Sequence, residues 1–307
     1  MNAHIHKPYH QLPVILFLFA QMLTLGTYII LFLITFLTFD PQPFMERSEI
    51  FYQGVKGILL IGLICVALLG LLKLQNKLYP STSFSIQLPH GKEETGWYLI
   101  FLGGLIFILA VKFFKIDLHL VSFIVFLGSV TYLFHLAKYY SFSIDRPSWH
   151  HPTTAGAMIE GSIILGLSFT LWMFKDRNLQ NIILSALLVI LTLEILTLWG
   201  RFRFLSKSNS LTQKTVRMLL GQFLALFGVR FIFGLIMPAV YLCWILLIST
   251  NIPYHPIILM VGVGELSERV LFFITSETIP EAKRPDTANF KISGENHENP
   301  GSTEHHS

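Results

Sequence analysis

Charged residues are scarce in this sequence: only 13% of its 307 residues are Asp, Glu, Lys or Arg, whereas 53% are hydrophobic. A soluble domain carries about 25% charged residues, which keep its surface in contact with water. The mean hydropathy of +0.60 therefore excludes an ordinary soluble domain and predicts a protein of the lipid bilayer. The net charge of +4 is small, so anionic lipid headgroups explain the basic residues better than nucleic acid does.

Groups that could hold a metal or a redox cofactor are also scarce. Cys65 and Cys243 are the two cysteines, and without a C-x-x-C spacing they cannot hold an iron–sulfur cluster by themselves. His119 and His135 fall on one predicted helix, about 24 Å apart by helical rise, so they cannot clamp one haem iron. We expect no haem, metal or iron–sulfur cluster in this chain. P-loop, G-x-G-x-x-G and H-E-x-x-H motifs are missing as well.

What the sequence has in abundance is long apolar runs. A hydrocarbon core of about 30 Å needs about 20 helical residues per crossing, and eight runs meet that length. They predict an all-α, polytopic integral membrane helical bundle of about eight transmembrane helices, with both termini on the same side. The expected crossings are Leu12–Thr38, Gly54–Leu74, Trp97–Phe114, Leu118–Tyr139, Thr154–Phe174, Gln180–Trp199, about Val229–Ser249, and Ile257–Ile274.

The seventh run is too long for one crossing, because Val216 to Ile248 would span about 50 Å as a helix. We therefore expect a separate interfacial helix over 211–227 and a crossing that begins near Val229. In that arrangement Arg230 lies near the membrane boundary, where its guanidinium can reach the headgroups.

Composition divides the chain into a membrane domain, residues 1–275, and a tail, residues 276–307. The tail is rich in Pro, Asn, Glu and His and has no apolar periodicity, so we expect it to be disordered. The protein is expected in the inner (cytoplasmic) membrane. The loops on the terminal side are longer and carry more Lys and Arg, which by itself favours a cytoplasmic location for both termini, although a docked partner or an anionic ligand could also require these charges.

Ionisable residues inside the expected crossings are candidate functional groups, because an unpaired charge in lipid costs several kcal/mol. Glu265 and Arg269 have the i, i+4 spacing of a same-face ion pair, which we interpret as a structural pair. Glu160 and Glu194 are single acids that could hydrogen-bond neighbouring helices in protonated form. An alternative is that these acids line the pathway of a small transporter or channel.

A crowded polar stretch joins the fourth and fifth expected crossings. Helical spacing places Tyr132, His135 and Tyr139 on one face, and a loop from Asp145 to Thr154 follows. These side chains could meet a polar ligand. They could equally be interfacial anchors, because aromatic rings and ammonium groups prefer the headgroup layer.

Several short motifs together resemble the membrane anchor subunit of dimethyl sulfoxide reductase-type molybdoenzymes. They are Leu12-Pro13 with Phe17, Gln21 and Gly26; Lys138-Tyr139-Tyr140, Pro147-Ser148-Trp149, Pro152-Thr153 and Gly166; and Gly264-Glu265-Leu266 with Arg269 and Phe272-Phe273. The resemblance runs from about His10 to Phe273. It implies eight crossings and no haem. It also implies an anchor that oxidises menaquinol and passes electrons to an iron–sulfur subunit, which feeds a molybdopterin catalytic subunit.

The resemblance further implies a quinol site at the boundary of the second and third crossings. There Lys73-Leu74-Gln75 replaces the His-Leu-Gly of the family, and Glu93 or Glu94 matches its acid. We expect Glu94 to accept a proton from the quinol, with Lys73, Glu93, Tyr139, Tyr140 and Trp149 around the headgroup. Lys73 either accepts a proton after desolvation, or only orients a quinone oxygen, or marks a lost site.

Overall fold

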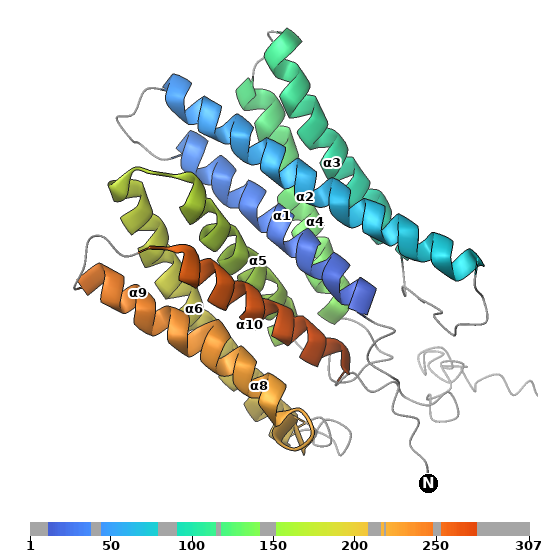
Figure 1. Cartoon of the computed structure of the whole chain (residues 1–307), viewed down its shortest axis with the longest axis vertical. Helices are drawn as coiled ribbons and strands as arrows, with labels where there is room; N and C mark the ends of the chain where they lie inside the picture. Colours follow the sequence, from blue (N-terminus) through green and yellow to red (C-terminus); the bar gives the residue numbers. More distant parts are fainter. Residues whose placement is uncertain are drawn as a thin grey trace, which may run out of the picture.

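The computed structural model describes residues 12–37, 44–78, 91–114, 118–141, 152–207, 216–217, 219–247 and 253–274. Within these ranges the regular structure is helical throughout, which confirms the all-α prediction (Figure 1). The elements are α1 (Leu12–Leu37), α2 (Phe44–Leu78), α3 (Gly91–Phe114), α4 (Leu118–Ser141), α5 (Pro152–Met173), α6 (Arg177–Lys207), α8 (Leu224–Phe231), the π-helix η2 (Ile232–Ile236), α9 (Met237–Leu247) and α10 (His255–Ile274).

Six of the described helices are long and apolar enough to cross a membrane. One of them is the continuous helix Leu224–Leu247, which is made of α8, η2 and α9. Helix α3 has a shorter apolar part, Thr95–Val111, and α10 carries three charged residues within its apolar run. Large apolar side chains such as Leu60, Ile124 and Leu196 are exposed on the outer surface of the bundle, as a lipid environment requires. The chain is thus a multi-pass helical membrane protein.

The seventh crossing begins earlier than the sequence predicts. A turn at 221–223 separates it from the short helical pieces at 216–217 and 219–220, so α8 starts at Leu224 rather than near Val229. Arg230 consequently lies inside the bundle, where it is 2% exposed, and the prediction that it reaches the headgroups is wrong. Acidic side chains on neighbouring helices make this position tolerable, as described below.

Helix α1 lies between α2 and α5, at the centre of the bundle (Figure 1). Its contact with α5 is made by small residues: a Cβ added at Gly166 would collide with the backbone of Gly26, and one added at Gly26 would collide with the backbone of Ser162. Gly234 in η2 and Gly264 in α10 meet in the same way. Lipid supplies no hydrophobic force between helices, so close backbone approach through small residues stabilises these contacts instead.

The helix ends that carry the predicted site lie at one end of the bundle. Figure 1 shows the end of α2, the start of α3 and the end of α4 at the same end of the bundle as the start of α1 and the end of α10. This arrangement matches the expected alternation of crossings. The tail predicted to be disordered, 276–307, lies outside the described residues.

Candidate functional site

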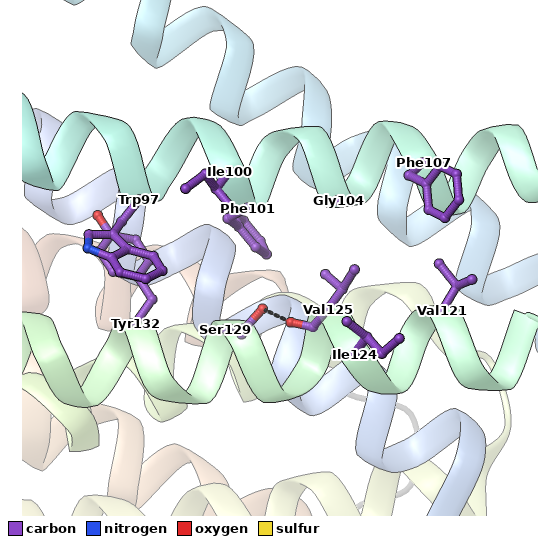
Figure 2. A pocket seen from close by; sticks show the side chains of 11 residues that line it. Trp97, Ile100, Phe101, Gly104, Phe107, Val121, Ile124, Val125, Ser129 and Tyr132 are labelled. Carbon is purple, nitrogen blue, oxygen red and sulfur yellow. Dashed lines mark hydrogen bonds between the residues drawn. The ribbon is translucent and has the colours of Figure 1, made fainter.

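A cavity of about 320 Å³ lies between α3 and α4 (Figure 2). Four of its lining side chains are aromatic, and two glycines leave room between the helices. Trp97 is 45% exposed and Ile124 is 59% exposed, so the cavity opens sideways toward the surroundings of the bundle. The lining residues are Trp97, Ile100, Phe101, Gly104, Phe107, Val121, Ile124, Val125, Gly128, Ser129 and Tyr132.

One end of this cavity is polar and the other is apolar. Trp97 and Tyr132 are at one end of the cavity, while Phe107 and Val121 are at the other (Figure 2). The Tyr132 hydroxyl accepts a hydrogen bond from Nε2 of the fully buried Gln21, at 2.8 Å, so α1 holds the ring in place from behind. The ring of His135, one turn further along α4, lies 6.3 Å from that of Trp97.

The acids predicted from the sequence lie just beyond this polar end. Glu93 and Glu94 are in the first turn of α3, four and three residues before Trp97. Lys73 lies near the end of α2. The side chains of these three residues, and the whole of Trp149, fall outside what the structure describes. Their roles at a quinol site remain predictions.

The two predicted tyrosines lie elsewhere on α4. Tyr140 is buried, with its ring 5.9 Å from that of Phe272 and 6.2 Å from that of Phe273, both on α10. The Tyr139 ring packs edge-on against Tyr140 at 5.3 Å. Neither tyrosine is among the residues that line the α3–α4 cavity. Their contacts tie the end of α4 to the end of α10.

A second polar centre, here called the ion cluster, is buried where α6, α8 and α10 meet. The predicted pair is present, since Arg269 Nη2 lies 3.2 Å from Glu265 Oε2. Arg230 Nη2 contacts Glu194, and it lies 3.1 Å from Glu265 Oε1 and 2.6 Å from Glu268 Oε2. Arg201 completes the group at 3.8 Å from Glu268. The ion cluster thus consists of Glu194, Arg201, Arg230, Glu265, Glu268 and Arg269.

The three carboxylates of the ion cluster lie close enough together to hold a cation. Ligand atoms of Glu194, Glu265 and Glu268 are all within 4.8 Å of one another. The Arg230 guanidinium contacts all three, so it supplies the positive charge that a metal ion would otherwise bring. Arg269 also donates to the backbone carbonyl of Ala157, at 3.3 Å, which joins α10 to α5.

Sequence reasoning missed several residues of both centres. Trp97 was expected only as the start of a crossing, although its spacing from Glu93 and Glu94 is a usable signal. Glu268 belongs to the same polar segment as Glu265, and a helical wheel alone cannot say which acid faces Arg230. Arg230 lies in the interior rather than at the membrane boundary because α8 starts earlier than the sequence predicts.

Comparisons of the chain with family models, with curated proteins and with solved structures give no match. The functional conclusion therefore follows from the residues of this chain and their geometry. What these establish is a multi-pass helical membrane protein with an aromatic cavity that opens sideways and a buried ion cluster.

Proposed function

We propose that the chain is the membrane anchor subunit of a dimethyl sulfoxide reductase-like respiratory molybdoenzyme of the inner membrane. In this proposal the chain binds and oxidises menaquinol and passes the electrons to an iron–sulfur subunit. Terminal reduction then takes place in a molybdopterin catalytic subunit. The observation that carries the proposal is the α3–α4 cavity, which combines aromatic walls, a sideways opening and one polar end.

The shape and chemistry of the cavity suit an isoprenoid quinol. Ligand pockets have volumes of about 300–1,000 Å³, are mostly apolar, and have a few polar groups that fix orientation. Here the flat headgroup fits between Trp97 and Tyr132, and the tail leaves along the apolar side past Gly104. A substrate that arrives dissolved in the bilayer requires the sideways opening.

Quinol oxidation releases two electrons and two protons, so the site needs a proton acceptor near each reacting hydroxyl. We assign one proton to Glu94, about one helical turn before Trp97, and the second to water at the same end of the bundle. From the first turn of α3, at the end of the bundle, a proton has a short way to water. The two electrons leave through the iron–sulfur partner, since this chain holds the substrate but provides no cysteine cluster.

The transporter or channel alternative gains no support from the ion cluster. Its acids are engaged by Arg230 and Arg269 rather than arranged along a passage, and the cavity beside them measures only about 10 Å³. A pathway for solutes needs wider, hydrated space between its ionisable groups.

The proposal predicts a loss of catalysis without a loss of binding when Glu94 is changed to Gln. The amide keeps the size and hydrogen bonding of the acid but cannot accept a proton, so menaquinol oxidation should fall about 10²-fold. Turnover is measured in membranes that contain the full complex, and Glu93→Gln is measured in parallel because Glu93 is the alternative acid. Binding of a menaquinol analogue is followed by quenching of Trp97 fluorescence.

Two tryptophan variants identify the quenching signal. Trp97→Phe should abolish most of the quenching, whereas Trp172→Phe should preserve it, because Trp172 is exposed on α5 and does not line the cavity. Unchanged turnover in both Glu94→Gln and Glu93→Gln would contradict the proposed site. Affinity purification of the chain without accompanying iron and molybdenum would contradict the proposed partners.

A further inference from the structure

The ion cluster has a charge balance that depends on one more residue. Its three carboxylates are matched by three guanidiniums. A fourth carboxyl, Glu160 on α5, is connected to this group through α6: the Thr197 hydroxyl donates a hydrogen bond to Glu160 Oε1 at 2.8 Å. Arginine stays protonated in proteins. Four carboxyls and three guanidiniums are therefore neutral only when one proton is bound among them.

The surroundings of Glu160 indicate that this carboxyl binds the proton. Among the described residues, no basic side chain forms an ion pair with Glu160, whose Oε2 atom is buried without a hydrogen-bond partner. A carboxylate in such a place would lack both hydration and a counter-charge, which costs several kcal/mol in a membrane interior. A protonated Glu160 avoids this cost.

A small cavity lies between Thr197, the hydrogen-bond partner of Glu160, and the ion cluster. It measures about 10 Å³ and is lined by Thr197, Glu194, Arg201 and Glu268, together with Ala157 and Leu198. Such a volume is enough for about one water molecule. Glu194, which is 2% exposed, lines this cavity and has an oxygen, Oε2, without a hydrogen-bond partner. An unpartnered buried carboxylate oxygen beside a water-sized space is a place where a water binds.

We infer that Glu160, Thr197, Glu194 and a water in this cavity form an internal proton-binding site that holds one exchangeable proton. At rest the proton is on Glu160, and the ion cluster is neutral. The inference does not rest on quinol chemistry, because it follows from the charges and contacts of α5, α6, α8 and α10.

Exchange of the proton needs no co-reactant. When Glu160 is charged, Thr197 Oγ1 gives its proton to Glu160 Oε1 and takes one from the water, which takes one from protonated Glu194. The net result moves one proton from Glu194 to Glu160. Glu194 becomes a carboxylate that is paired with Arg230. The reverse steps return the proton, and the total charge is unchanged throughout.

Charged groups on the other helices packed against α5 do not alter this balance. Helix α1 brings no charged residue between Val14 and Phe36. The described acidic, lysine and histidine side chains of α2 and α4 are exposed. From α6 and α10 the charges that face the site are those of the ion cluster. The exposed groups are Glu49 and Lys56 on α2, and His119, His135 and Lys138 on α4.

Infrared spectroscopy of the full-length protein in lipid nanodiscs tests the inference, since a protonated carboxyl has a carbonyl band separate from that of a carboxylate. We expect one such band at neutral pH that shifts in D₂O. Glu160→Gln should remove the band. Thr197→Val should move it to higher frequency, because the carbonyl loses its hydrogen bond. Thr192→Val is the matched control on α6: its hydroxyl bonds only to the backbone of Leu188, so the band should not change.

Each variant is first checked by size-exclusion chromatography, and Glu160→Asp, which retains the acid, should retain a protonated band. A band that persists unchanged in Glu160→Gln, or the lack of a protonated carboxyl in the wild-type protein at neutral pH, would overturn the inference. If Glu160→Gln fails to fold, Thr197→Val tests the inference instead. An unshifted band in Thr197→Val would overturn it, because the protonated carboxyl would then not be the one that accepts a hydrogen bond from Thr197.

Discussion

The α1–α4 side of the bundle and the α6–α10 side bury polar groups in opposite ways. Around α1 the polar contacts are neutral: Gln21 with Tyr132, Thr24 with Tyr98 at 3.0 Å, and the Tyr28 hydroxyl donating to the Ser122 carbonyl at 2.9 Å. Where α6, α8 and α10 meet, the buried polar groups are instead full charges, held in the ion cluster.

The cavities described in the two regions also differ in size. The cavity between α3 and α4, beside the neutral hydrogen bonds, measures about 320 Å³. Buried charges must be compensated in a low dielectric, and the cavity beside the ion cluster measures about 10 Å³. The first region is suited to a ligand, and the second to holding helices and a proton.

The largest expected effect comes from removing the central charge of the ion cluster. Arg230→Met leaves three carboxylates without their shared partner, so we expect the folded state to lose about 3–5 kcal/mol and the protein to be recovered poorly. Thermal unfolding in detergent measures the loss. Arg203→Met is the control. This substitution also removes an arginine, but Arg203 is exposed on α6, so the stability of the protein should change little.

A double variant sharpens the Arg230 test. Adding Glu194→Gln to Arg230→Met removes one of the stranded charges and should recover part of the stability. An Arg230→Met protein as stable as the wild type would remove the distinction between the two regions.

An intermediate effect is expected where α1 and α5 approach most closely. Gly166→Ala introduces a methyl group against the backbone of Gly26, which cannot move aside as a side chain would. Overpacking of this kind costs about 1–3 kcal/mol. Gly156→Ala on the same helix is the control, because its methyl group would meet only Thr197 Cγ2 at 3.7 Å. Equal unfolding temperatures for the two variants would contradict the close contact.

The smallest effect on stability, with a selective effect on binding, is expected from filling the α3–α4 cavity. Gly104→Leu directs a side chain into the space, where its Cβ would meet Val125 Cγ2 at 2.9 Å, so affinity for a menaquinol analogue should fall about 10-fold while the shift of Val125 costs about 1 kcal/mol. Gly103→Leu, next to it, adds a Cβ that has no atom within 4 Å, so this variant should bind normally. Similar affinities for both variants would show that the ligand binds elsewhere.

Much of the fold follows from local sequence, and rather little of the two centres does. The apolar runs predict the helices well, and the i, i+4 spacing predicts the Glu265–Arg269 pair. Arg230 shows where the prediction fails: misplacing the start of α8 by about one turn moved it from the interior to the boundary. Trp97 and Tyr132 are visible in the sequence, but their pairing across a cavity depends on how far apart α3 and α4 lie.

The sequence by itself determined that this is a helical membrane protein, because in lipid a long apolar segment must satisfy its backbone hydrogen bonds within itself. Only the tertiary structure decided which side chains meet. Glu194 and Arg230 are separated by 36 positions in the chain, and Gln21 and Tyr132 by 111, so no local pattern relates them. Their partners are set by which face of each helix packs against its neighbours, and that choice belongs to the bundle as a whole.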